Sequence, residues 1–121
     1  MSRYEYARDQ ISQSKLIFDH LDAVQLVKHA FGLRTEASRR SKRPCLVYLT
    51  AEPKKWPDGR DVDAFKKERH RKEIITFADL VAGDEVTFVP VTYQDLISAF
   101  AASDIEGVVD HGQAIQSVFQ P

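Results

Sequence analysis

Apolar side chains recur at helical spacing most clearly between Asp19 and Arg40. They form a stripe wide enough for burial on more than one side, which predicts the central helix of the fold. Its members are Leu21, Val24, Leu26, Val27, Ala30, Phe31 and Leu33. Asp19 is the predicted N-cap, because a carboxylate can accept hydrogen bonds from the amides of a first helical turn.

Weaker patterns on either side of this helix predict the next elements. Residues 3–18 are loosely periodic and predict a helix, and the β-forming run CLVYLT at residues 45–50 predicts an interior strand. Residues 62–83 predict a second long helix with an exposed, basic middle. Residues 84–92 predict a strand in which Pro90 favours an end or an edge, because proline has no amide hydrogen to donate.

The remaining segments predict a loop and two further helices. Residues 52–61, EPKKWPDGRD, carry two prolines and a Pro-Asp-Gly turn signal, so we expect a surface loop anchored by Trp56. The last helices are expected over residues 92–103, with Thr92 as cap, and over residues 105–119.

Two strands are few for an α/β domain. Strands separated by a long helix pair in parallel only through a crossover, so the sequence predicts a small, incomplete α/β sheet flanked by helices. The sheet is completed either by a strand in the N-terminal segment or by a second copy of the chain, and we expect a homo-oligomer.

Composition is typical of one α/β domain over residues 1–121. The chain has 43% hydrophobic and 29% charged residues, and domains cluster near this length. Its single cysteine, Cys45, lies in an apolar run, which predicts a buried thiol in a reducing compartment and hence a cytoplasmic location. No apolar run approaches the roughly 20 residues of a membrane-spanning helix, so no membrane partner is expected.

Charge is segregated along the chain. Residues 1–72 hold 17 Lys and Arg against 10 Asp and Glu, a balance of +7, whereas residues 73–121 hold 8 acids and no Lys or Arg, a balance of −8. Two basic clusters can hold phosphates through charge and counterion release, or can be solvated faces that pair with the acidic part. The RRSKR cluster comprises Arg39, Arg40, Lys42 and Arg43, and the KKERHRK cluster comprises Lys66, Lys67, Arg69, Arg71 and Lys72.

One stretch resembles a known nuclease core. HLDAVQLVKHAFGL, residues 20–33, looks like the helix after the catalytic strand in the PD-(D/E)XK superfamily, particularly its RecB-like branch with a Gln-x-x-x-Tyr motif. Gln25 and His29 match that motif, with His in place of Tyr. Residues 19–100 are similar to the C-terminal portion of such a core, so the resemblance implies a restriction endonuclease-like sheet and a nuclease-related function.

The chain departs from that family upstream. Such nucleases place an acid and a Glu-x-Lys on two strands before this helix, where the carboxylates bind a divalent ion. The first 18 residues contain no Glu-x-Lys, so the chain is either a shortened relative or a reading that starts downstream of the true beginning. Glu52-Pro53-Lys54, with Asp19 or Asp22, is a weak substitute, because it follows the helix and Pro53 lacks an amide.

Other site candidates are few. His20 and His29 are nine residues apart, about 180° around a helix, so they cannot share an ion. We therefore expect no catalytic set, no metal site and no cofactor, with Mg²⁺ relevant only if the Glu52 set were catalytic. Gln25 on so apolar a helix is more often a buried structural residue.

The resemblance implies a nuclease-related or nucleic-acid-associated function, non-catalytic in the isolated chain, with DNA as the expected partner. An assembly module that self-associates through its oppositely charged parts is the alternative. The predicted contact residues are Gln25, Arg39, Arg40, Lys42, Arg43, Lys66, Lys67 and Arg71.

Overall fold

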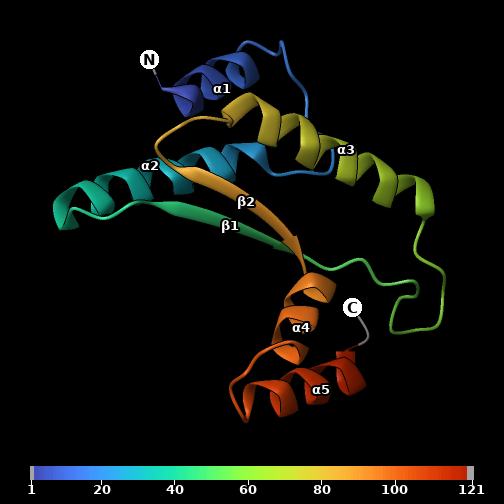
Figure 1. The fold of residues 1–121 in the computed structure, drawn as a ribbon. Coiled ribbons are helices and arrows are strands. Elements are labelled where there is room, and N and C mark those ends of the chain that lie inside the picture. The colour runs from blue at the N-terminus through green and yellow to red at the C-terminus, as the bar shows by residue number, and fades with distance from the viewer. Residues whose placement is uncertain (1, 120–121) are drawn as a thin grey trace. The chain divides into compact units, whose positions relative to one another are not determined.

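The computed structural model describes residues 2–119, and it confirms the predicted small α/β fold (Figure 1). The described part has five helices and two strands. In chain order they are α1 (Arg3–Ser12), α2 (Ala23–Arg40), β1 (Cys45–Thr50), α3 (Ala64–Val81), β2 (Thr87–Thr92), α4 (Tyr93–Ala101) and α5 (Val108–Phe119). None of the helices within residues 2–119 combines the length and the apolar character that a membrane crossing requires.

The sheet consists of β1 and β2, which pair in parallel. Parallel strands need a crossover, and α3 supplies it between them. The N-terminal segment adds no third strand among the described residues, because residues 3–12 form α1 instead. Each strand therefore keeps one edge without a partner strand in the described part of the chain.

Contacts divide the chain into two compact units. Within residues 2–119 the first unit holds residues 2–48 and 64–89, and the second holds residues 49–63 and 90–119. The single domain expected over residues 1–121 stays a prediction.

The core of the first unit surrounds the ring of Phe77, which has no exposed surface. Tyr4 and Phe18 each place a ring centroid 6.1 Å from it, and Phe88 places one at 5.1 Å. All three contacts are edge-to-face, a favoured geometry for aromatic pairs. The buried cluster as a whole comprises Tyr4, Ala7, Leu21, Ala23, Leu26, Val27, Ala30, Leu46, Ile74, Phe77, Val81 and Val86.

Two helix boundaries differ from the sequence prediction. The first helix ends at Ser12 rather than near Phe18. The prediction that Asp19 caps the central helix is wrong: α2 begins at Ala23, and the carboxylate of Asp22 accepts a hydrogen bond from the Gln25 amide at 3.1 Å. Three residues earlier, at Asp19, the chain forms a bend and is not yet helical.

The predicted burial of Cys45 is also wrong. Side chains of β1 alternate, so Leu46 is buried and Tyr48 is half-buried, while Cys45 and Val47 are exposed. One face of this strand packs on the core, and the other face is open in the described structure. The apolar run had predicted burial on both faces.

In the second unit, α4 and α5 pack against each other. The close approach requires Gly112, since a Cβ there would lie 2.7 Å from the Cβ of Phe100. Thr92 caps α4 as predicted, with its hydroxyl accepting from the Asp95 amide at 3.0 Å. The turn at Gly59, whose φ is +89°, is confirmed, but Trp56 is half exposed and is not a buried anchor.

Candidate functional site

The RRSKR cluster lies where α2 ends and the chain turns into β1. Arg39 and Arg40 are in the last turn of the helix, and Ser41 takes the left-handed conformation at φ +52°. The Lys42 amide donates to the Ala37 carbonyl at 3.0 Å, which bends the chain back over the helix end. This local geometry gathers four cations at one place on the surface.

One carboxylate partly compensates these cations. Glu36 accepts from Arg39 at 3.3 Å and from Arg40 at 2.5 Å. Both arginines are also favoured by the negative end of the helix dipole. Lys42 and Arg43 lie beyond the helix, are exposed, and make no side-chain hydrogen bond or ion pair with any residue between 2 and 119. Four cations against one acid leave a local charge of +3.

The KKERHRK cluster occupies the N-terminal half of α3. Arg69 pairs with Asp19 at 3.3 Å, and Arg71 lies 3.9 Å from Glu68. Lys66 and Lys72 are exposed, whereas Lys67 is partly buried.

The structure places the two clusters towards opposite ends of the first unit (Figure 1). The RRSKR cluster lies at the C-terminal end of α2, and the KKERHRK cluster is on the N-terminal half of α3. Gln25 is in the first turn of α2, about 21 Å along the helix from Arg39 at 1.5 Å per residue. It is exposed rather than buried, and its amide nitrogen lies 3.5 Å from Nε2 of His29. The predicted contact residues therefore do not form one continuous site.

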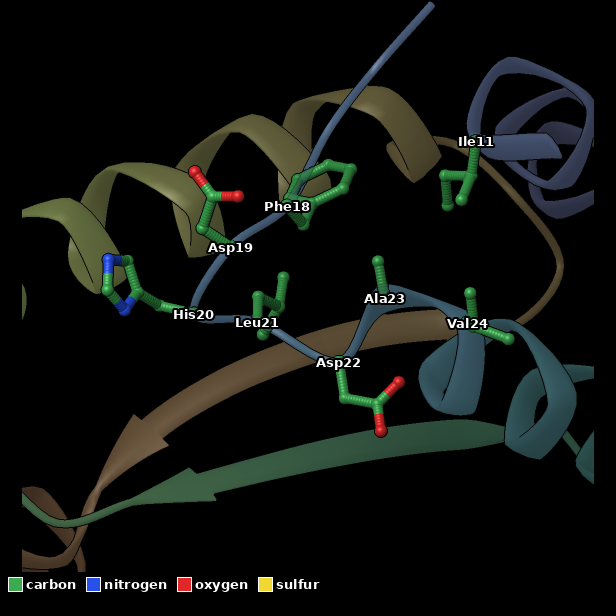
Figure 2. Close-up of a pocket in the computed structure, with 8 residues that line it drawn as sticks. All are labelled: Ile11, Phe18, Asp19, His20, Leu21, Asp22, Ala23 and Val24. Carbon is green, nitrogen blue, oxygen red and sulfur yellow. The ribbon is translucent and has the colours of Figure 1, made fainter. Parts of the chain in front are cut away.

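A pocket of about 350 Å³ lies at the start of α2 (Figure 2). In Figure 2, Asp19 and His20 lie beside α3, and Asp22 extends towards β1. The lining residues are Ile11, Phe18, Asp19, His20, Leu21, Asp22, Ala23 and Val24.

The wall of this pocket is fixed by two side chains of α3. The Glu73 carboxylate accepts hydrogen bonds from the amides of Asp19 and His20, the latter at 3.0 Å. Arg69, four residues earlier on α3, pairs with the Asp19 side chain. This pairing holds residues 19 and 20 against α3, and α2 starts after them, at Ala23.

A tyrosine and a histidine meet close to this segment. The Tyr48 hydroxyl lies 2.9 Å from Nε2 of His70, with the rings edge-to-face. Burial, and secondarily the charge of Asp22, raises the pKa of Tyr48 above its ordinary value. Sequence reasoning missed this pair. The available signals were that Tyr48 is two residues after Leu46, on the same inward face of the strand, and that His70 lies four residues before buried Ile74.

The described residues show no preformed metal centre. No group of three or more His, Cys, Asp or Glu side chains in residues 2–119 is arranged to hold an ion. Asp19 and Asp22 belong to the first unit, whereas Glu52 and Lys54 belong to the second. The expectation of no metal and no catalytic set stays a prediction.

Comparison with known proteins identifies no relative. No family model matches the chain, and neither a search of curated proteins nor a search of solved structures finds a match. The resemblance to PD-(D/E)XK nucleases therefore rests on the sequence pattern alone.

The raised pKa of Tyr48 predicts a change in stability at alkaline pH. The folded state keeps this phenol protonated where the unfolded chain ionises, near pH 10. The stabilisation that protonated Tyr48 gives the folded state is complete below about pH 10 and is lost as pH rises through the pKa of Tyr48 in the folded state. We expect Tyr48→Phe to reduce the alkaline fall in unfolding free energy, measured by urea titration. The variant should still show part of this fall, because burial also raises the pKa of Tyr4.

The exposed Tyr6 supplies the matched control for this experiment. Tyr6→Phe should leave the alkaline fall unchanged. An identical fall in wild type and Tyr48→Phe would contradict the assignment.

Proposed function

We propose that this chain binds nucleic acid through its phosphates and does not cleave it. The observation that carries the proposal is the RRSKR cluster, where Lys42 and Arg43 extend the basic end of α2 into solvent. The helix dipole and Glu36 account for Arg39 and Arg40 as stabilising residues. They do not account for Lys42 and Arg43, which neither belong to the helix nor pair with an acid in residues 2–119.

Cations of this kind bind phosphates and carry little sequence information. Their long, exposed side chains can follow a flexible backbone, and each phosphate neutralised releases counterions. The KKERHRK cluster adds a second basic surface on α3. Affinity is therefore expected to be weak, strongly salt-dependent and largely indifferent to sequence.

The resemblance to PD-(D/E)XK nucleases supports the same class of ligand. A chain similar to the part of such a core that follows the catalytic strands keeps a nucleic-acid surface without the residues that cleave. The proposal includes three further parts: a restriction endonuclease-like origin, DNA as the ligand, and a cytoplasmic location in which Cys45 is reduced.

The open face of the sheet favours a second candidate function, self-assembly. Val47 is 57% exposed, and Cys45 beside it is exposed too. Parallel sheets are ordinarily covered on both faces, and an unpaired strand edge can accept another chain. A second copy can cover this face, and the net charges of +4 and −5 on the two units favour pairing between copies.

Removing two cations should separate phosphate binding from other interactions. Lys42→Ala with Arg43→Ala should weaken binding to duplex DNA and lower the slope of log K against log salt by about 2, since each phosphate contact contributes about 0.9. Fluorescence anisotropy over a range of salt concentrations measures both the affinity and this slope. Arg3→Ala with Lys15→Ala is the matched control, because it removes the same charge outside both clusters. Unchanged binding in the first variant would exclude the RRSKR cluster.

Purified chain with Mg²⁺ or Mn²⁺ should leave supercoiled plasmid intact. Hydrolysis needs carboxylates that converge on the ion and a cation that stabilises the transition state, and Glu52, Lys54, Asp19 and Asp22 are the only candidates from the sequence. Gel electrophoresis of the plasmid detects a single nick. Nicking that is lost in Glu52→Ala and in Lys54→Ala, yet retained in Cys45→Ser, would overturn the non-catalytic assignment.

Sedimentation tests the assembly candidate. If a second copy covers the sheet, the 13.8 kDa chain should sediment as a dimer at micromolar concentration, and Val47→Lys should shift it to monomer because a charge cannot be buried there without cost. Val118→Lys, at another exposed valine, is the control. A wild-type monomer would remove this candidate without affecting DNA binding.

A further inference from the structure

One side of α3 combines an exposed aromatic ring with cations. Phe65, Arg69, Lys72 and Thr76 follow each other at intervals of four, three and four residues, which places them on the same side of the helix. All four are exposed, and Phe65 keeps 66% of its surface in contact with solvent. The opposite side, with Ile74, Phe77 and Val81, is buried in the core. We call the four residues the α3 stripe.

The ring of Phe65 is held in place by its neighbour. The Arg69 guanidinium carbon lies 5.7 Å from the ring centroid, within the range of a cation–π contact. Arg69 is held in turn by Asp19 at 3.3 Å, so the cation has a fixed position beside the ring. An apolar ring presented to water beside an anchored guanidinium is suited to a ligand that has both a π-face and a negative charge.

We propose that the α3 stripe binds single-stranded nucleic acid, with a base stacked at Phe65 and phosphates held by Arg69 and Lys72. This inference rests on the proposed function and specifies its ligand. A helix rises 1.5 Å per residue, so Arg69 and Lys72 follow Phe65 by about 6 Å and about 10 Å along α3. The stripe thus presents one aromatic ring and two cations in a line, which is the combination that single-strand-binding proteins use.

The single strand is the form that fits. Bases in a duplex are paired and stacked, so their faces are not available to an exposed ring on a helix surface. A protein partner fits less well, because the other members of the stripe are charged or polar and do not extend Phe65 into an apolar patch. Stacking on an aromatic ring also tolerates any base, consistent with phosphate contacts that carry no sequence information.

The test compares three fluorescent ligands of equal length on the full chain by anisotropy. They are a thymidine oligonucleotide, a duplex and an abasic strand, which keeps the phosphates but has no bases. Wild type should bind the thymidine strand at least about 5-fold more tightly than the abasic strand, the lower limit expected for one stacked base. Equal affinity for the two strands would overturn the inference, and this comparison needs no variant.

Variants of Phe65 locate the effect. Phe65→Leu should weaken binding of the thymidine strand at least about 5-fold and leave the duplex and the salt slope unchanged, because no charge is removed. Phe65→Tyr keeps the ring and should keep the affinity. Ile75→Ala, an exposed aliphatic residue of α3 outside the stripe, is the control and should bind as wild type.

The outcomes separate this inference from the function it rests on. If wild type binds none of the three ligands, the proposed nucleic-acid function fails. If it binds them in a salt-dependent way, but Phe65→Leu has no effect on the thymidine strand, phosphate binding stands and stacking on Phe65 is excluded. Equal loss for strand and duplex in Phe65→Leu also counts against stacking.

Discussion

Burial of the Phe77 ring is the interaction on which the first unit depends. The ring belongs to α3, and it contacts Tyr4 from α1, Phe18 from the segment before α2, and Phe88 from β2. Three parts of the chain that are distant in sequence are thus fixed to one helix. Removal of a buried Phe side chain typically costs about 3–5 kcal/mol, a large share of the stability of a domain this small.

The same burial determines what α3 presents to solvent. Once the side with Ile74 and Phe77 faces the core, the helical period places Phe65 and Arg69 outwards. The chain of rings continues from Phe88 to Tyr48, 6.3 Å away, and from there to His70. Core packing therefore sets the orientation of the basic side of α3.

Local spacing predicts the elements well, and it fails where distant residues decide. Asp19 has the residue type and position of a cap, but Glu73, 54 positions away from it, holds its amide, and the cap falls to Asp22. Cys45 begins a run that is typical of a strand buried on both faces, yet Leu46 is buried while Cys45 and Val47 are exposed. The contact of Tyr48 with His70 joins residues 22 apart. Each error concerns a partner that sequence neighbours cannot reveal.

The fold also decides which of the chain's charges remain available to a ligand. Three of the four acids in residues 73–85 bind elsewhere in the first unit and do not pair with the RRSKR cluster. Glu73 holds the segment before α2, Asp84 accepts from the Arg3 amide at 2.8 Å, and Glu85 lies 3.6 Å from Arg34. The acidic part of the first unit thus stabilises its N-terminal elements. Lys42 and Arg43 are left with solvent as their neighbour, and the proposed binding of phosphates rests on these two exposed cations.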